Sequence, residues 1–349
     1  DNRRAFVALA QAEGANISLL CRRFGISRKS GHKWLARAKA GEPLSDRPRR
    51  PRTSPKRSDA ATEQAVLALR SAHPTWGGRK LRRRLSDQRK AEVPSASTIT
   101  AILRRHDQLG TTEPASPHAF TRFEHDRPNA LLQMDFKGHF PIGTGRCHPL
   151  AVLDDHSRYV LCLAACGDER GATVRTHLTE VFRQYGLPER MNADNGAPWG
   201  SGPGNPYTPL VVWLMRLGIR FGHSRPYHPQ TNGKAERFNR TLLADVIQGR
   251  LFPDLPACQR AFDRWRTTYN TERPHQALAL ALALATPVSR YRISPHPFPE
   301  QLPEVIYGPD YSVRRVQQGG WLTFRGREIS VPKAFQGERL AVRPTQQDG

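Results

Sequence analysis

Residues 227–246, YHPQTNGKAERFNRTLLADV, contain the pattern around which the rest of this chain is interpreted. Asn232-Gly233 is a helix-start signal, and apolar residues then recur at spacings of three and four, which predicts a helix with one apolar face. Glu236 lies on the flank of that face, so its carboxylate faces solvent or a polyanion while the helix is anchored in a core. Taken alone, Glu236 also fits an ordinary solvated helix face. The apolar positions are Ala235, Phe238, Leu242 and Val246, and the neighbouring cations are Lys234, Arg237 and Arg240.

Two upstream segments place further carboxylates at strand positions. The segment LLQMDFKGHF, 131–140, has the length and residues of a strand and contains Asp135, and RMNADNG, 190–196, places Asp194 at the end of a second strand. A carboxylate within an apolar strand is costly unless it is paired or binds a metal. Three carboxylates from two strands and a helix can hold two hard cations through oxygen ligands. Two divalent metals are suited to in-line displacement at a phosphodiester.

The segments MDFKG, NADNG and HPQTNGKAERFNRTL resemble the Asp-Asp-Glu (DDE) catalytic core shared by bacterial insertion-sequence transposases and retroviral integrases. The resemblance covers residues 120–290 and includes NTERPHQAL at 270–278. It implies that Asp135, Asp194 and Glu236, the carboxylate triad, are the catalytic and metal-binding residues. It also implies two Mg²⁺ ions per active site, with Mn²⁺ as a substitute. The 41 residues between Asp194 and Glu236 exceed the integrase spacing, and the Gly/Pro-rich piece 197–207, expected to be a surface loop, accounts for the excess.

The positive charge of the chain is concentrated in its first third. The chain has 349 residues and a formal charge of +23, of which residues 1–110 contribute 25 Lys and Arg against 9 Asp and Glu. A polyanion is therefore expected to bind there. Because the same region also has helical periodicity, double-stranded DNA is the predicted partner, with solvated disorder as the alternative.

Residues 1–40 have the pattern of a helix-turn-helix DNA-binding domain, with a tight turn at 25–27 and Ser27 as the cap of the second helix. A helical pair that only packs together is the alternative. The predicted contacts with a major groove are Arg28, Lys29, Ser30 and Lys33. The basic Pro/Arg-rich linker, 41–58, follows, and either it is a solvated tether or it lies along a minor groove. Its predicted minor-groove residues are Arg49, Arg50 and Arg52.

Residues 59–110 repeat this pattern as a second helix-turn-helix domain. WGGRKLRRRL, 76–85, packs its leucines beneath a basic face, and Ser95 or Ser97 caps the last helix, STITAILRRH. The predicted DNA contacts of that helix are Ser97, Thr98, Thr100 and Arg104. Two such domains joined by a basic tether can read an extended DNA site, and insertion-sequence transposases resemble this layout.

Residues 120–290 are expected to form an α/β catalytic core with a mixed sheet in the order βββαβαβα. The resemblance implies that this core has the ribonuclease-H-like fold. Asp154, Asp155 and Asp168 are rival carboxylates near the sheet, and the first two lie in an expected hairpin turn, where Asp side chains cap backbone groups. The residues predicted to hold phosphates close to the metals are Lys137, Asn195, Lys234 and Arg237.

Residues 300–349 contain several short segments with the alternating pattern of strands, separated by Gly turns, which predicts a small β-barrel. If such a barrel requires a further strand after Val342, it is incomplete in this sequence. It resembles the C-terminal barrel of integrases. The expected architecture is thus multidomain: N-terminal all-α helix-turn-helix units, an α/β ribonuclease-H-like core and a small C-terminal β-barrel.

No segment predicts a membrane partner. The run ALALALALA, 277–285, is too short to span a bilayer and is expected to be a helix segment. The five cysteines are scattered without metal-ligand spacing, which favours a reduced protein. The expected location is cytoplasmic, in a bacterium and associated with the nucleoid.

The resulting hypothesis is a DNA transposase, a polynucleotidyl transferase that cleaves transposon ends to free 3′-hydroxyls and transfers them into target DNA. Insertion joins two target strands, so a homo-oligomer, at least a dimer on paired ends, is expected from the family chemistry. A non-catalytic sequence-specific DNA-binding regulator derived from a transposase is one alternative. A nuclease of the ribonuclease-H type is another, although it would have no use for the basic N-terminal domains.

Overall fold

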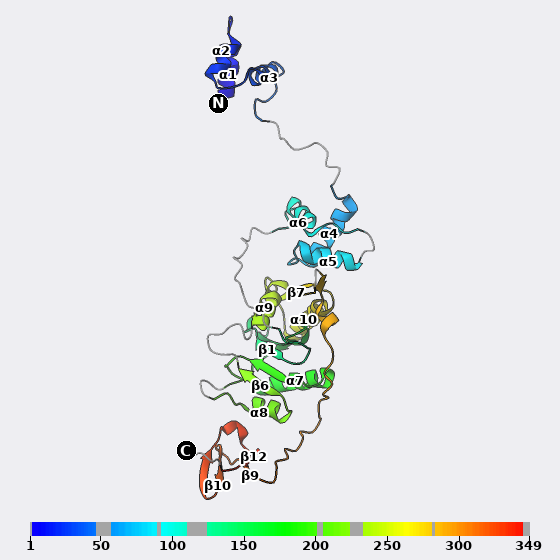
Figure 1. Cartoon of the computed structure of the whole chain (residues 1–349), viewed down its shortest axis with the longest axis vertical. Helices are drawn as coiled ribbons and strands as arrows, with labels where there is room; N and C mark the ends of the chain where they lie inside the picture. Colours follow the sequence, from blue (N-terminus) through cyan, green and yellow to red (C-terminus); the bar gives the residue numbers. More distant parts are fainter. Residues whose placement is uncertain are drawn as a thin grey trace. The chain divides into compact units, whose positions relative to one another are not determined.

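The computed structural model describes residues 2–46, 57–88, 92–109, 124–200, 205–223, 233–280 and 283–344. Packing divides the chain into two compact units, Asp1–Arg57 and Ser58–Gly349, which are described separately (Figure 1). The predicted minor-groove residues Arg49, Arg50 and Arg52 lie outside the described residues. None of the helices in the described ranges combines the length and the apolar character needed to cross a membrane.

The first unit contains the predicted helix-turn-helix. Its helices are α1 (Asn2–Ala10), α2 (Ile17–Arg23) and α3 (Arg28–Lys39). Ser27 caps α3 as expected, because its hydroxyl accepts a hydrogen bond from the backbone N–H of Ser30 at 3.2 Å. Gly25 has a φ of +63° in the turn between α2 and α3, a conformation that favours glycine. The centre of the unit is formed by Phe6, Val7 and Cys21.

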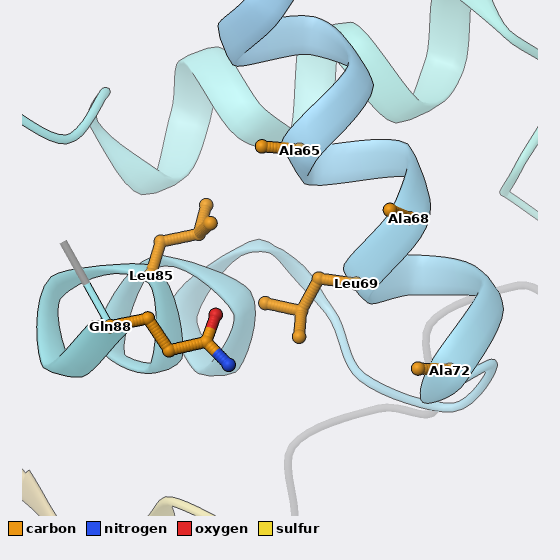
Figure 2. A pocket seen from close by; sticks show the side chains of 6 residues that line it. All are labelled: Ala65, Ala68, Leu69, Ala72, Leu85 and Gln88. Atoms are coloured by element: carbon orange, nitrogen blue, oxygen red, sulfur yellow. The ribbon is translucent and has the colours of Figure 1, made fainter.

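The second unit begins with another group of helices, α4 (Ala60–Ala72), α5 (Gly78–Gln88) and α6 (Ala96–Arg105). Ser95, one of the two predicted caps, accepts a hydrogen bond from the backbone N–H of Thr98 at 3.2 Å. The shared core includes Trp76, Leu81, Ile99 and Ile102. Alanines along α4 leave a hollow of about 450 Å³ against α5 (Figure 2), which is lined by Ala65, Ala68, Leu69, Ala72, Leu85 and Gln88.

A mixed sheet forms the centre of the core domain. Its strands, in the described part of the chain, are β1 (Leu132–Phe136), β2 (Phe140–Ile142), β3 (Gly145–Asp154), β4 (Val160–Cys166), β5 (Arg190–Ala193) and β6 (Arg220–His223). Antiparallel pairing joins β1, β2 and β4 to β3, whereas β1, β5 and β6 pair in parallel. The single strand expected over 131–140 is divided into β1 and β2, since Gly138 adopts a φ of +85° between them.

Helices cover both faces of this sheet. On one face pack α7 (Gly171–Tyr185) and α8 (Pro209–Arg216). On the other pack α9 (Gly233–Leu242), its π-helical continuation η2 (Leu243–Ile247) and α10 (Leu255–Thr271). Successive residues of β3 alternate between the two cores, with Leu150 and Val152 in the first and Ala151 and Leu153 in the second. The observed order is ββββαβαβα, which differs from the expected βββαβαβα order by the division of 131–140 into β1 and β2.

The helix expected within 277–285 is wrong. The structure forms a hairpin there, with β7 (His275–Leu280) paired antiparallel to β8 (Ala283–Ala285). Leu and Ala alternate at every second position of the sequence, which matches the period of a strand and not the 3.6-residue period of a helix.

The expected small C-terminal β-barrel is not confirmed. After α11 (Pro287–Arg290), the described residues form two small open sheets. One pairs β10 (Trp321–Phe324) with β11 (Arg327–Ser330), and the other pairs β9 (Ser312–Arg315) with β12 (Arg339–Val342). A short 3₁₀ helix, η3 (Lys333–Phe335), connects β11 to β12.

The packing of α5 against α6 yields a testable prediction. A Cβ atom at Gly78 would lie 2.5 Å from the backbone oxygen of Ala96 and 2.4 Å from the Thr100 hydroxyl, whereas one at Gly77 would meet nothing within 4 Å. Gly78→Ala should therefore push the helices apart and lower the free energy of unfolding by about 1–3 kcal/mol, as overpacking does. Gly77→Ala, the control, should change it by less than about 0.5 kcal/mol. Urea unfolding measures both, and equal effects of the two variants would contradict the close fit of α5 on α6.

Candidate active site

Strand β1 turns two polar side chains toward helix α9. Met134 belongs to the core under α7 and α8, so the alternation of a strand directs its neighbours Gln133 and Asp135 to the opposite face. There the carboxylate of Asp135 accepts a hydrogen bond from the Asn239 side-chain amide at 2.7 Å. The side-chain oxygen of Gln133 accepts one from the backbone N–H of Ala235 at 3.3 Å. Two contacts thus join the strand of Asp135 to the helix of Glu236.

Asp194 is brought to the same edge by the parallel pairing of β1 with β5. The register pairs Leu132 with Met191 and Gln133 with Asn192. Asp194 follows the last residue of β5, so continuing this register by two residues places it beside Asp135. Its carboxylate accepts a hydrogen bond from the backbone N–H of Gly196 at 3.0 Å, which orients the side chain in the loop after the strand.

Glu236 lies in the first turn of α9 and is exposed. The predicted apolar stripe anchors this helix, because Ala235, Phe238, Leu242 and Val246 are all buried. The amphipathic helix is therefore confirmed, although its start falls at Gly233 and the residues before it lie outside the described ranges.

The electrostatics of Asp135 indicate that the triad carboxylates are neighbours. Burial, and then the negative charges of Asp194 and Glu236, raise the pKa of Asp135 from its ordinary value of 3.8 to about 7. The hydrogen bond from Asn239 acts in the opposite direction and is outweighed. Mutual repulsion of this kind is relieved by a bound cation.

The donor atoms of the triad fit a hard divalent metal such as Mg²⁺, which prefers carboxylate oxygens. Among the described residues, no three His, Cys, Asp or Glu side chains already lie close enough together to form a metal site. The carboxylates of Asp194 and Glu236 are exposed, so their rotamers are free to change around an ion.

The rival carboxylates are engaged by protein donors. Asp154 accepts hydrogen bonds from the backbone N–H groups of Asn129 at 2.8 Å and Ser157 at 2.7 Å, as expected for an Asp in a hairpin turn. Asp155 accepts from the backbone N–H of His125 at 2.9 Å. The carboxylate of Asp168 accepts from Arg170 N–H at 2.9 Å and the Thr173 hydroxyl at 2.6 Å, before α7. These three side chains have structural partners of their own.

The predicted phosphate contacts within the core fall into two groups. Arg237 and Asn195 are exposed and Lys137 is half-buried, each next to or near a triad residue in sequence. Lys234 differs, because its ammonium forms an ion pair with the fully buried Asp155 and its side chain is only 16% exposed. Burial is the main cause that lowers the pKa of Lys234 to about 8. A phosphate contact by Lys234 remains a prediction that this placement does not favour.

The predicted contacts in the helical domains are mostly on the surface. Arg28, Lys29 and Lys33 are exposed on α3, and the hydroxyl of Ser30 lies 3.0 Å from that of Ser27. On α6, Ser97 and Arg104 are exposed and Thr98 is half-buried. The Thr100 hydroxyl instead donates a hydrogen bond to the Ala96 backbone oxygen at 2.8 Å and lies against Gly78 of α5. The Thr100 side chain therefore points into the domain.

Gln133 and Asn239 were missed by the sequence analysis. Gln133 contacts Ala235, the residue before Glu236, and Asn239 contacts Asp135 itself; both side chains are buried. Their spacing offered a signal, because Gln133 is two residues before Asp135 on a strand and Asn239 is three residues after Glu236 on a helix.

Comparison with protein families finds integrase, transposase and helix-turn-helix domains along the chain. Two models described as an integrase core domain match residues 125–229 and 217–281. The C-terminal domain of the IS481 family transposases matches residues 311–349. A helix-turn-helix domain matches residues 2–52 and a homeodomain-like domain matches residues 30–103.

Individual proteins show the same likeness. The Pro-Pol polyprotein of simian foamy virus type 3 (strain LK3) is 28% identical over 189 residues, or 52% of this chain and 16% of the polyprotein. An uncharacterized 39.2 kDa protein of insertion element IS476 from Xanthomonas euvesicatoria is 27% identical over 150 residues, or 43% of this chain and 42% of that protein. The chain therefore spans less than half the length of either relative.

Solved structures of integrases are also similar. The intasome of simian T-cell lymphotropic virus in complex with PP2A regulatory subunit B56 gamma has a TM-score of 0.41 at 17% identity, covering 80% of this chain and 100% of the other. The HTLV-2 integrase catalytic core domain in complex with magnesium has a TM-score of 0.36 at 18% identity, covering 48% of this chain and 99% of the other.

Taken together, the family matches and the insertion-element relative confirm the resemblance to insertion-sequence transposases with an integrase-like core.

The raised pKa of Asp135 predicts a pH dependence of stability in the metal-free protein. As the pH rises past 3.8, the unfolded chain releases this proton, whereas the folded chain keeps it until about pH 7. The folded state binds more protons in this window, so the contribution of Asp135 to the free energy of unfolding falls as the pH rises through it. Asp135→Asn cannot ionise and should gain stability relative to the native chain between about pH 4 and about pH 7. Urea unfolding at a series of pH values measures the difference.

The control is Asp168→Asn. Hydrogen bonds from Thr173 and Arg170 lower the pKa of Asp168, so its contribution to stability is lost as the pH falls, with the opposite sign. If the stability of Asp135→Asn followed that of the native chain across the whole pH range, the raised pKa of Asp135, which comes from burial and from the neighbouring charges, would be refuted.

Proposed function

We propose that the chain is a DNA transposase of the insertion-sequence type, which cleaves transposon ends to free 3′-hydroxyls and transfers them into target DNA. The observation that carries the proposal is the convergence of Asp135, Asp194 and Glu236. Besides burial, the charges of Asp194 and Glu236 raise the pKa of Asp135, and the three residues lie on or beside two paired strands and on the helix packed on them. The integrase-core matches span all three positions.

Each triad residue supplies carboxylate oxygens toward a divalent metal, with Mg²⁺ as the expected ion and Mn²⁺ as a substitute. Such a metal, when bound, activates the attacking oxygen and stabilises charge on the leaving oxygen of a phosphodiester. The Asn239 amide orients Asp135 through its 2.7 Å hydrogen bond. Lys137, Asn195 and Arg237 are the proposed contacts for the phosphates that flank the reacting bond.

The chain's own residues position the DNA for both steps. Cleavage requires a water oxygen in line with the 3′-oxygen that leaves, and joining requires the freed 3′-hydroxyl in line with a target phosphodiester. Both are displacements at phosphorus, so one arrangement of carboxylates and flanking cations serves both steps. The proposed end-recognition residues are Arg28, Lys29, Ser30 and Lys33 on α3, and Ser97, Thr98 and Arg104 on α6.

Two chains at least are proposed to act together on paired ends, because insertion joins two strands of the target. The proposed location is the bacterial cytoplasm, where such a protein would be associated with the nucleoid. The positive charge of the helical domains supports binding to a DNA polyanion.

The triad predicts the outcome of a strand-transfer assay. With Mg²⁺, a plasmid target and labelled transposon-end DNA, the full chain should produce joined product. Asp135→Asn, Asp194→Asn and Glu236→Gln should each reduce joining by at least about 100-fold, since each removes an anionic metal ligand, while end binding survives. Glu180→Gln is the matched control, because Glu180 belongs to an exposed ion pair on α7, on the opposite face of the sheet from α9.

The product also reports on assembly. Concerted joining of two labelled ends to one plasmid requires two active sites together. End binding without joining by the native chain would support the DNA-binding regulator instead, and cleavage without joining would support a nuclease.

A second experiment tests which helix reads the end sequence. Arg28 is exposed at the start of α3, so Arg28→Ala should reduce discrimination between the cognate and a scrambled end by about 1–3 kcal/mol, the usual worth of a base contact. Lys39→Ala, at the other end of the same helix, should leave discrimination unchanged. Competition binding at fixed salt measures both. A uniform loss of affinity for every sequence in Arg28→Ala would assign that residue to the phosphate backbone.

A further inference from the structure

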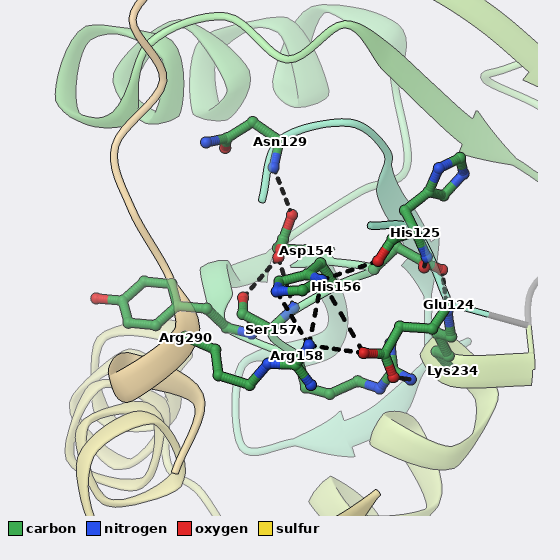
Figure 3. A network of polar contacts seen from close by, with 11 residues as sticks. Glu124, His125, Asn129, Asp154, His156, Ser157, Arg158, Lys234 and Arg290 are labelled. Carbon is green, nitrogen blue, oxygen red and sulfur yellow. Dashed lines mark hydrogen bonds and ion pairs between the residues drawn. The ribbon is translucent and has the colours of Figure 1, made fainter. Parts of the chain in front are cut away.

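Beside the triad, the structure contains a buried polar network at the turn between β3 and β4. Figure 3 shows Asp154 held by the backbone N–H of Asn129 and by Ser157, with Lys234 at the side of the same network. Asp154, Asp155 and Ser157 are all 0% exposed. These contacts clamp the turn, so the carboxylate of the next residue, Asp155, has a fixed position.

From this turn, Asp155 contacts both β1, the strand that contains Asp135, and α9, the helix that contains Glu236. One carboxylate oxygen accepts a hydrogen bond from the Gln133 side-chain amide at 2.9 Å and forms the ion pair with Lys234. The other accepts from the backbone N–H of His125. Gln133 then accepts from the N–H of Ala235, one of the first N–H groups of α9, which have no partner within the helix. The start of α9 is therefore fixed to the sheet at two successive residues, immediately before Glu236.

The burial of this ion pair is not explained by stability alone. Removing two charges from water costs several kcal/mol, and a buried ion pair is often no more stabilising than apolar side chains of the same size. An apolar pair cannot supply direction, whereas here Lys234 and Gln133 must both meet the same carboxylate oxygen of Asp155. We propose that the Asp155–Lys234 ion pair, together with Gln133, positions Glu236 relative to Asp135 and thereby sets the metal affinity of the triad.

This inference rests on the proposed function only in taking the triad as the metal site. Lys234, Asp155 and Gln133 are positioning residues and do not touch the metal. Partners that orient metal ligands typically contribute about 10–100-fold in metal affinity. Among the three proposed ligands, Glu236 depends most on these positioning contacts, since it is exposed on a helix and is not held by a neighbouring strand.

The test is Mn²⁺ binding to the full chain without DNA, measured by electron paramagnetic resonance. Gln133→Leu and the double variant Asp155→Asn/Lys234→Met should each bind Mn²⁺ about 10–100-fold more weakly than the native chain. The double variant removes both charges together, which avoids leaving one buried and unpaired. Arg240→Met, which removes an exposed cation of the same helix, is the matched control and should retain native affinity.

A second measurement reads the network directly. Hydrogen exchange at the Ala235 amide should accelerate in Gln133→Leu, which removes the acceptor of that N–H, and in the double variant, which weakens the contacts that hold Gln133 and the start of α9. It should not change in Arg240→Met. Thermal unfolding identifies any variant that has not folded. Lys234→Met alone should leave the affinity for end DNA and its salt dependence unchanged.

The outcomes separate the two proposals. Native Mn²⁺ affinity in the folded double variant, with Asp135→Asn abolishing binding, would overturn the positioning role and leave the transposase proposal intact. Mn²⁺ binding by no variant, the native chain included, would overturn the metal site, and the Ala235 exchange rates would still decide whether the network fixes α9. A loss of DNA affinity and a shallower salt dependence in Lys234→Met would assign Lys234 to a phosphate instead.

Discussion

Repulsion among three like charges is the constraint that the core domain has to satisfy. Burial, and then the charges of Asp194 and Glu236, raise the pKa of Asp135 to about 7, so the folded chain holds these carboxylates together against their electrostatics. The free energy that makes this possible comes from elsewhere. Helices on both faces of the sheet bury two apolar cores, and the carboxylates lie at the edge where β1, β5 and α9 meet.

The rigidity of the three supporting elements is unequal. β1 is paired with both β3 and β5, which fixes Asp135 within the sheet, and Asp194 directly follows the last residue of β5. Helix α9 has no such ladder, and its position depends on the apolar stripe below it and on side-chain contacts at its start. The contacts from Gln133 and Asp155 supply what the helix cannot obtain from its own backbone, namely a defined position along and around its axis.

Recognition and chemistry are assigned to different parts of the chain. The helical domains carry most of the excess positive charge, while the core carries the converging carboxylates. A site of negative charge attracts DNA poorly by itself, so in the proposed function the basic residues elsewhere and the cations flanking the triad bring a phosphodiester to it. Thr100 shows the limit of reading contacts from a helix sequence, because its side chain is turned into the domain and away from any groove.

The sequence by itself determined the amphipathic helix of Glu236 and the strands that contain Asp135 or end just before Asp194, because hydrophobic periodicity is a local signal. The caps Ser27 and Ser95 were readable for the same reason. The catalytic role of the three carboxylates was implied by the family resemblance and stands as a proposal. Only the tertiary structure decided the contacts of Lys234, Asp155 and Gln133. Whether a lysine meets a phosphate or a buried aspartate depends on residues about 80 positions away, here Asp155, and local pattern carries no information about such long-range pairing.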